Sequence, residues 1–151
     1  RTLLLEADEP IDSRSELLLF LAARADHVTR VIDPALSEGK VVLCDRFTHS
    51  TLAYQGYGRG LNLDELKRLC SFASHDLKPD LTLFLDVPVA VGMERREQRG
   101  KADRMEREEI AFHERVRAGF LDLASEMEVV DATASAEAVA QKAWRHIEPL
   151  L

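Results

Sequence analysis

An aspartate and an arginine, Asp45 and Arg46, directly follow the apolar run 41–44 and could together bind a magnesium-complexed phosphate. A carboxylate there can hold a hydrated Mg²⁺ ion, and the neighbouring guanidinium can bind a phosphate through two parallel hydrogen bonds. A structural ion pair would explain the same two residues equally well. Ser50 and Gln55 follow shortly after and offer neutral donors and acceptors, although polar side chains are common in loops. The segment is therefore a candidate phosphate site that other parts of the chain must support.

Phe20 and Arg24 are spaced four residues apart in a segment with helical periodicity, so they are expected to share one face of a helix. An aromatic ring beside a guanidinium could stack on a flat base while the guanidinium bonds to the edge of that base. Taken alone, an aromatic residue at helical spacing is more often part of the core. The pair is therefore either a base-binding pair or a structural one.

The region 95–107 is basic in an otherwise acidic chain. It carries six basic and three acidic side chains, whereas the formal net charge of the whole chain is −7. Such an island can bind an anionic ligand, although charged runs are more often solvated helix faces. The acidic total argues against a surface for duplex nucleic acid, which would be basic. The basic side chains are those of Arg95, Arg96, Arg99, Lys101, Arg104 and Arg107.

The printed sequence contains no Gly-x-x-x-x-Gly-Lys-Ser/Thr motif, the loop whose backbone amides hold nucleotide triphosphates. We therefore expect the chain as printed to bind the phosphates of ATP poorly. It opens on Arg1, directly before an apolar run, and we expect that N-terminal sequence precedes it. The two cysteines, Cys44 and Cys70, are too few for a disulfide framework, which favours a cytoplasmic protein. No apolar run approaches the roughly 20 residues needed to cross a membrane.

The elements that position these residues alternate between strands and helices. The apolar runs 41–44 and 81–85 show no polar alternation, which predicts strands buried on both faces, and each run is followed by an aspartate. We predict an α/β fold, a doubly wound parallel sheet with helices on both faces, as a single domain over residues 1–151. The other predicted elements are a helix from the capping box at Ser13 to Gly39, a glycine-rich loop at 56–60, a helix from Asn62 to about Ala73, helices from about Pro88 and over 106–125, a strand at 129–130 and a helix from about Ala136.

Several short stretches together resemble the bacterial thymidylate kinase family along essentially the whole chain. The resemblance implies a P-loop nucleoside-monophosphate kinase fold whose N-terminal βαβ portion is absent here. It also implies phosphoryl transfer from ATP to thymidine 5′-monophosphate (dTMP), giving dTDP and ADP in dTTP biosynthesis, and we expect the chain without its phosphate loop to be inactive. The stretches are LLLFLAAR at 17–24, DRF at 45–47, STLAYQG at 50–56, GRG at 58–60, KPDLTLFLDV at 78–87 and DRME at 103–106.

For the base of dTMP, the resemblance implies a pocket on the first helix and the segment after Arg46. Phe20 would stack on thymine, and Arg24 together with Thr51 would read the edge of the base. Ser50 and Gln55 would line the same pocket.

For the acceptor phosphate, the resemblance implies that Arg46 binds the 5′-phosphate with help from Arg1. Asp45 would act with Arg46 in catalysis by placing Mg²⁺, through a water molecule, beside the acceptor phosphate. Magnesium would thus be the cofactor, with ATP as co-substrate.

For ATP, the resemblance implies a lid formed by residues from about 95 to 107. Arg99 is the first candidate for the arginine that stabilises the transferring phosphoryl group, with Arg95 and Arg96 next, because charge delivered by a closing lid acts only when ATP is bound. The remaining residues predicted to contact ATP are Arg104, Asp131, Ala132 and Thr133.

Two other functions remain open for this sequence. A deoxynucleoside kinase-like enzyme also places Asp-Arg after a strand but accepts a nucleoside that has no 5′-phosphate. A non-catalytic, kinase-like module for binding or dimerisation would explain the missing phosphate loop, although it would have no reason to keep the acceptor residues. Family resemblance suggests a homodimer packed through helices, including the helix of Phe20 or its neighbour, with no nucleic-acid or membrane partner.

Overall fold

The computed structural model describes residues 11–100 and 103–151, and Asp12 caps the first helix among them. Its carboxylate accepts hydrogen bonds from two backbone N–H groups in the first turn of α2 (Ser13–His27), at 3.0 and 3.2 Å. This is the bonding of a helix N-cap, which satisfies N–H groups that have no partner within the helix. The capping box predicted to begin at Ser13 is therefore wrong by one residue.

Helix α2 is followed directly by two further helical elements. It passes through a π-helical turn, η1 (Val28–Ile32), into the short helix α3 (Asp33–Ser37). Pro34 lies in the first turn of α3, directly after the π-helical turn, and as a proline it donates no backbone hydrogen bond to that turn. Gly39 follows with a φ of 72°, a left-handed conformation that glycine adopts easily, so the end predicted at this glycine is confirmed.

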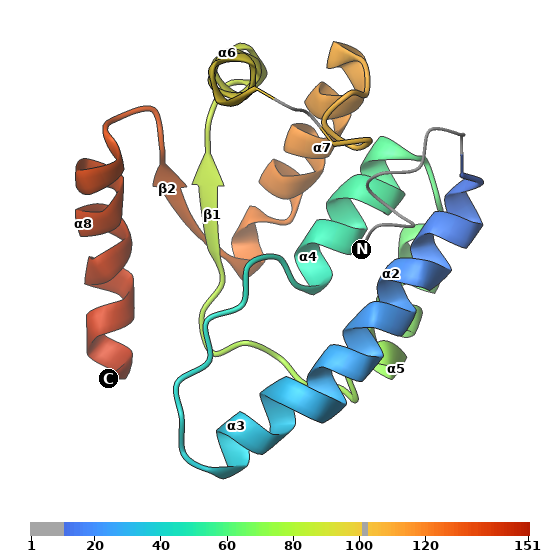
Figure 1. Cartoon of the computed structure of the whole chain (residues 1–151), viewed down its shortest axis with the longest axis vertical. Coiled ribbons are helices and arrows are strands. Elements are labelled where there is room, and N and C mark those ends of the chain that lie inside the picture. The colour runs from blue at the N-terminus through green and yellow to red at the C-terminus, as the bar shows by residue number, and fades with distance from the viewer. Residues whose placement is uncertain (1–10, 101–102) are drawn as a thin grey trace. The chain divides into compact units, whose positions relative to one another are not determined.

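The chain divides into two compact units, Arg1–Lys78 and Pro79–Leu151. In the first unit, α2 packs against α5 (Leu63–Ala73), the blue and the yellow-green helices of Figure 1. The side chain of Asn62 accepts a hydrogen bond from the backbone N–H of Glu65 at 3.0 Å, which confirms the predicted start of α5. Among its described residues, the buried apolar side chains are Leu17, Leu21, Val28, Ile32, Leu52, Ala53, Leu66, Cys70 and Ala73.

Residues 41–44 do not form the predicted strand. The side chains of Val41 and Leu43 are 76% and 94% exposed, whereas the apolar run predicted burial on both faces. A strand is stabilised by its ladder of hydrogen bonds to a neighbour, and within residues 11–100 and 103–151 no strand pairs with this segment. Apolar composition alone therefore does not make it a strand.

Of the glycine-rich segment 56–60 that was predicted as a loop, residues 56–58 are helical instead. The short helix α4 (Thr48–Thr51) continues directly into the π-helical segment η2 (Leu52–Gly58). Gly56 lies against α5, and a Cβ atom at this position would come within 2.5 Å of Cδ2 of Leu63. Gly60, with a φ of 76°, follows the end of the segment. One glycine thus allows close helix packing, and the other allows a turn.

The second unit contains a parallel βαβ arrangement. Strands β1 (Leu83–Asp86) and β2 (Glu128–Asp131) pair in parallel. Parallel neighbours need a long crossover, and here α6 (Val89–Arg99), α7 (Ile110–Asp122) and the 3₁₀ turn η3 (Ala124–Glu126) lie between the two strands in the chain. The parallel pairing confirms the α/β character predicted from the sequence.

Two helices cover this small sheet. Helix α7 packs on β1, where the rings of Phe84 and Phe120 stack with centroids 4.9 Å apart. Helix α8 (Ala136–Ile147), capped by the side chain of Ser135, contacts β2 and ends in a 3₁₀ turn, η4 (Glu148–Leu150). Figure 1 shows α8 in red beside β2. The buried apolar side chains are Met105, Phe112, Val116, Leu123, Val130 and Ala132.

The helix starts predicted near Pro88 and Ala136 and the strand at 129–130 are confirmed. Helix α7 is shorter than predicted because residues 104–107 form a turn, and the helix begins only at Ile110. Across the residues that the structure describes, none of the helices has the length and apolar character needed to cross a membrane.

Candidate active site

Phe20 and Arg24 both lie on α2 and are both partly buried rather than part of the core. The guanidinium carbon of Arg24 lies 5.2 Å from the centroid of the Phe47 ring, within the range of a cation–π contact. Burial lowers the pKa of Arg24. Its Nη1 atom is buried and has no hydrogen-bond partner among the described residues. Because a buried donor left unpaired costs about 1–3 kcal/mol, this nitrogen is well suited to bind an acceptor on a ligand.

Arg46 has a left-handed backbone, with a φ of 71°. Residues other than glycine rarely adopt this conformation, and such strain of about 1–3 kcal/mol is concentrated at functional sites. The side chain is exposed, and its guanidinium carbon lies 5.0 Å from the centroid of the Tyr54 ring. The thiol of Cys44 lies 3.6 Å from the carbonyl oxygen of Arg46. Asp45, beside it, is exposed too, so both charged groups are accessible to a ligand.

The neutral residues predicted to line the pocket differ in exposure. Ser50 is partly buried at the start of the helical segment, whereas the side chains of Thr51 and Gln55 are both about 2% exposed. Burial raises the pKa of the Cys70 thiol, which shares a hydrogen bond with Thr51. The amide nitrogen of Gln55 donates to Oε1 of Glu16 at 2.9 Å. Gln55 is therefore already engaged by the protein.

In the second unit, Arg95 is bound to the loop after β2. Its Nη1 donates to the carbonyl oxygen of Ala132 at 2.9 Å, and its Nη2 donates to that of Thr133 at 3.1 Å. The structure thus joins two of the predicted ATP-binding segments, the end of α6 and residues 131–133, through one guanidinium.

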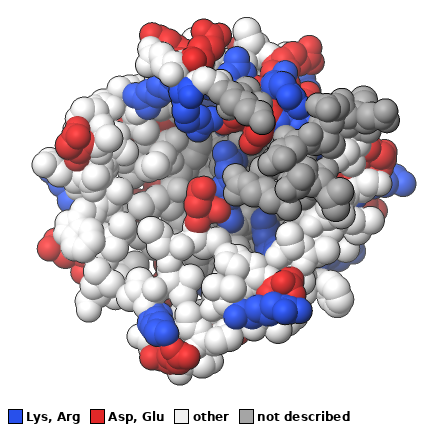
Figure 2. All heavy atoms as spheres, in the orientation of Figure 1, with Lys and Arg blue, Asp and Glu red and all other residues white. Residues whose placement is uncertain are grey.

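Arg96 and Arg99, near the end of α6, both bind Glu106. Arg96 donates to its carbonyl oxygen, and Arg99 forms an ion pair with its carboxylate. The Glu106 carboxylate also accepts a hydrogen bond from the backbone N–H of Asp103 at 3.0 Å. The backbone N–H of Glu106 in turn donates to the Asp103 carboxylate at 2.8 Å. Burial alone would raise the pKa of Glu106, but the hydrogen bonds from Asp103 and Arg99 and the charges of Arg99 and Arg96 outweigh it and lower that pKa. Figure 2 shows basic and acidic side chains intermingled over α6, at the top of the view.

The remaining residues predicted to contact ATP have local partners. Arg104 lies with its Nη2 at 3.5 Å from the sulfur of Met105. The carboxylate of Asp131 accepts hydrogen bonds from the hydroxyl of Thr133 at 2.7 Å and from its backbone N–H at 3.0 Å, and Lys142 lies 3.2 Å away. These contacts lower the pKa of Asp131 to about 2, and the hydrogen bond from the Thr133 hydroxyl has the largest effect.

The residues available for a magnesium ion can be assessed from their chemistry. Within residues 11–100 and 103–151 there is no cluster of three or more His, Cys, Asp or Glu side chains that could hold a metal. Mg²⁺ at a phosphoryl-transfer site usually takes one or two carboxylates, several waters and oxygens of the substrate phosphates, so it does not require such a cluster. The exposed carboxylate of Asp45 fits that kind of ligation.

The first unit therefore brings together Phe20 with Arg24 on one helix and Arg46 with Tyr54 on another segment. The second unit brings Arg95 to the 131–133 loop, and Arg96 and Arg99 to Glu106. Arg1 lies outside the described residues.

Comparison with known proteins gives one consistent family. The family model described as thymidylate kinase matches residues 1–143. The chain belongs to the thymidylate kinase family. Proteins named thymidylate kinase are similar to it at 55% identity in Thermosynechococcus vestitus, 48% in a Synechococcus species and 50% in Geobacter sulfurreducens. The matches cover 83%, 100% and 93% of this chain and 52%, 73% and 71% of the relatives. The chain thus spans about half the length of the first of these relatives and under three quarters of the other two.

For this thymidylate kinase family member, the structure also shows two ion pairs that sequence reasoning missed. Glu16 forms an ion pair with Arg59. Asp86, at the end of β1, accepts hydrogen bonds from Nε and Nη2 of Arg117 at 2.8 and 2.9 Å. The hydrogen bond to Asp86 raises the pKa of Arg117. The aspartate at the end of a strand was a visible signal, but its partner 31 residues away was not. Glu16 stands three residues after Ser13, the spacing of a capping box, and nothing in that local pattern indicates a partner 43 residues away.

Proposed function

We propose that this chain carries the dTMP-binding and lid residues of an enzyme that transfers a phosphoryl group from ATP to dTMP, giving dTDP and ADP. The observation that carries the proposal is the family match over residues 1–143, together with a buried guanidinium nitrogen on Arg24 that has no hydrogen-bond partner among the described residues. We propose further that the βαβ arrangement belongs to a doubly wound sheet of the P-loop kinase type, in a single kinase domain.

In the proposed acceptor site, Phe20 stacks on thymine while Nη1 of Arg24 donates to the edge of the base, with Thr51 beside it. Arg46 binds the 5′-phosphate, because an exposed guanidinium held over a tyrosine ring offers a planar pair of donors to two phosphate oxygens. These contacts orient the acceptor oxygen and restrict its motion. Orientation of this kind supplies a large part of the rate in phosphoryl transfer.

In the proposed donor site, the lid arginines stabilise the negative charge that spreads over the transferring phosphoryl group. Arg99 is the best candidate, because it is exposed near the end of α6 and already forms an ion pair with a carboxylate, a geometry that a phosphate can replace. Arg95 holds the loop at 131–133, which we propose lies near adenine. Magnesium, when bound, would neutralise phosphate charge and order the two phosphates, and Asp45 would hold it through water.

The test compares dTMP with thymidine as ligands of the chain as printed, by isothermal titration calorimetry. We expect dTMP to bind at least about tenfold more tightly, because charge-assisted hydrogen bonds to the phosphate contribute about 1.5–3 kcal/mol. Arg46→Ala should reduce dTMP affinity toward that of thymidine and leave thymidine binding unchanged. Thymidine binding as tightly as dTMP would favour the deoxynucleoside kinase alternative.

Turnover distinguishes an enzyme from a binding module. The full-length gene product should phosphorylate dTMP with ATP, whereas binding of dTMP without turnover would favour the non-catalytic alternative. The chain as printed should bind ATP poorly, because its sequence contains no phosphate loop.

We also propose a homodimer packed through helices. The apolar side chains of Leu18 and Val31, on α2 and η1, are 59% and 52% exposed in the single chain, which favours a partner surface there. The molar mass in solution, measured by light scattering, tests this, and Leu18→Glu should shift a dimer toward monomer. Because both proposed substrates are cellular nucleotides, the proposed activity implies a cytoplasmic enzyme.

A further inference from the structure

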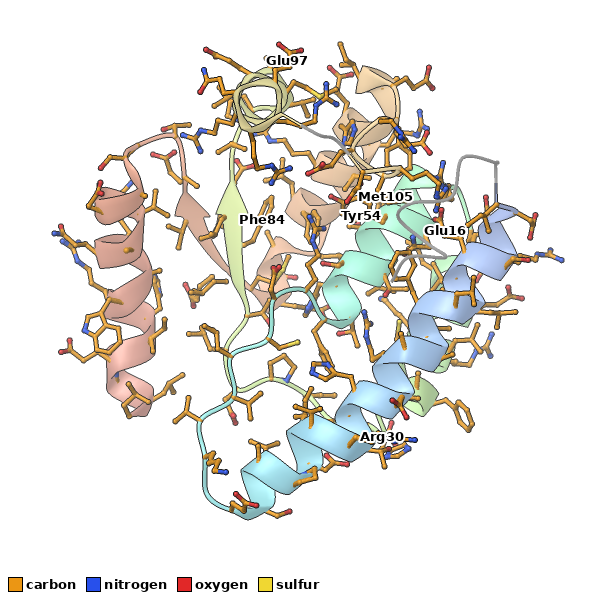
Figure 3. The ribbon with its side chains drawn as sticks, in the orientation of Figure 1. Glu16, Arg30, Tyr54, Phe84, Glu97 and Met105 are labelled. Carbon is orange, nitrogen blue, oxygen red and sulfur yellow. The ribbon has the colours of Figure 1, made fainter. Side chains whose placement is uncertain are left out.

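Glu16 is an acidic side chain with 0% exposure, placed in the first turn of α2. It does not cap the helix, because Asp12 does so. Its side chain lies where α2 and the segment containing Tyr54 approach each other (Figure 3). Burying a carboxylate is costly unless it is paired and hydrogen-bonded, so its partners identify its role.

The carboxylate of Glu16 binds Gln55, in the middle of η2, and Arg59, the residue after η2. Its Oε1 accepts hydrogen bonds from Nε2 of Gln55 at 2.9 Å and from Nε of Arg59 at 3.3 Å. Its Oε2 accepts from Nη2 of Arg59 at 3.1 Å, so the guanidinium binds both oxygens. The Arg59 side chain is only 17% exposed, and Gln55 only 2%. The contact is therefore a largely buried ion pair with an added neutral donor.

A buried ion pair of this kind is weak evidence for stability. The free energy lost on removing two charges from water roughly offsets their attraction, and well-packed apolar side chains of similar size are often as stabilising. The geometry is more restrictive than an apolar contact, because a two-pronged guanidinium–carboxylate pair fixes both distance and angle. The triad Glu16–Gln55–Arg59 therefore fixes the position of η2 relative to α2.

The two elements that the triad joins carry the proposed acceptor residues. Glu16, Phe20 and Arg24 follow one another at intervals of four and share a face of α2. Thr51 directly precedes η2. We infer that Glu16 is a positioning residue for dTMP binding, which acts through Gln55 and Arg59 to hold Thr51 at the correct distance from Phe20 and Arg24. Because the amide nitrogen of Gln55 donates to Glu16, the glutamate also fixes the orientation of the Gln55 side chain, which is expected to line the pocket. This inference rests on the proposed function.

The test uses two variants of the chain as printed and calorimetric titration with dTMP. Glu16→Gln keeps the shape and one acceptor oxygen but removes the charge, and Arg59 can turn toward solvent, so the variant should fold. The triple variant Glu16→Leu, Gln55→Leu, Arg59→Met replaces the triad by apolar side chains of similar size. Both should bind dTMP about tenfold more weakly, since small misplacement of binding groups is costly. The melting temperature of the triple variant should be no lower than that of the parent.

A double-mutant cycle separates positioning from general destabilisation. If Glu16 holds Thr51 at the correct distance from Phe20, Glu16→Gln should weaken dTMP binding much less in a Phe20→Ala background than in the parent. Glu38→Gln, the same substitution in an exposed ion pair with Lys40, is the matched control and should leave binding unchanged.

The outcomes are distinguishable. Parent-like dTMP binding by Glu16→Gln or by a folded triple variant would overturn the inference and leave the proposed function intact. Equal losses in both backgrounds of the cycle would overturn it as well. A parent chain that does not bind dTMP would overturn the proposed function and, with it, this inference.

Discussion

The arginines of the first unit and those of the second differ in what they bind. In the first unit, Arg24 presents a buried nitrogen that has no partner among the described residues, and Arg46 lies exposed over a tyrosine ring. In the second unit, Arg95 and Arg99 are already bound to carbonyl oxygens and to a carboxylate of the protein. Arg24 thus presents a nitrogen that a ligand can bind directly, whereas the lid arginines must exchange a protein partner for a phosphate.

This difference matches two tasks in catalysis. Groups that bind substrate gain affinity when they are held in place before it arrives. A group that stabilises only the transition state should not act until the second substrate is bound, and an exchangeable partner keeps it occupied until then. The predictions below test whether this division between the two units is correct.

The largest expected effect is on turnover, from the lid. Arg99→Ala in the full-length gene product should lower kcat at least about tenfold, toward the 10³–10⁵ range of arginines that stabilise phosphoryl transfer, with little change in dTMP affinity. Arg99→Lys should recover little of the rate, because an ammonium cannot reproduce the planar fork. Steady-state and single-turnover kinetics measure this. If Arg99→Ala turns over normally, Arg99 only stabilises the end of α6, and the contrast between the units fails.

The next effect is on binding, from the acceptor side. Arg24→Ala should weaken dTMP binding by about 1–3 kcal/mol, because the base edge loses a donor that is buried with it. Calorimetric titration of the chain as printed measures the loss. Arg30→Ala is the matched control, since Arg30 lies on the next turns of the same helical segment in an exposed ion pair with Asp26. Unchanged affinity in Arg24→Ala, combined with a lower melting temperature, would make Phe20 and Arg24 structural.

Local signals in the sequence predicted part of this arrangement, and distant partners account for the rest. The cap at Asn62 lies three residues from its partner and was predictable, as were the starts of α6 and α8. The ion pair of Glu16 with Arg59 spans 43 residues, and the bond of Arg95 to Ala132 spans 37, so no local pattern reveals either. The run 41–44 failed as a strand for the same reason, because a strand depends on a neighbour that its own residues do not specify.

The candidate site was predicted differently from the fold. Residue type and spacing made Phe20, Arg24 and Arg46 candidates, the family resemblance gave them their roles, and their contacts to dTMP remain predictions. The structure adds what surrounds them: the left-handed backbone of Arg46 and the unpartnered nitrogen of Arg24 are consistent with a binding role but were not readable from residue types. Charge density in the region 95–107 indicated a site for an anionic ligand, and the family resemblance implied a lid, but neither indicated that Glu106 would bind these arginines.

A smaller effect is expected from Glu106. Glu106→Gln should release Arg99, so kcat should stay within a few-fold of the parent, in contrast to Arg99→Ala. The variant should lose stability by up to about 1 kcal/mol, the usual range for partly exposed ion pairs. The folded-state pKa of Glu106 is lowered, so this contribution is complete above the ordinary value of 4.5 and is lost as the pH falls through the folded pKa. Melting temperatures of parent and variant should therefore converge in acid. A large loss of kcat in Glu106→Gln would make the glutamate itself catalytic.

The smallest effect is expected at Asp131, whose contacts order the loop that Arg95 also binds. Its pKa of about 2 lies below the ordinary 3.8, chiefly because the Thr133 hydroxyl and backbone N–H donate to its carboxylate, with Lys142 adding a further donor. The stabilisation is therefore complete above pH 3.8 and is lost as the pH falls from there to about 2.

NMR titration should show a clear rise of the Asp131 pKa in Thr133→Val and a smaller rise in Lys142→Ala. Thr133→Ser keeps the hydroxyl and should leave this pKa low. If Lys142→Ala has the larger effect, charge rather than the hydroxyl holds this loop. In each of these variants the affinity for dTMP should equal that of the parent, because we propose that the loop contacts ATP and not dTMP.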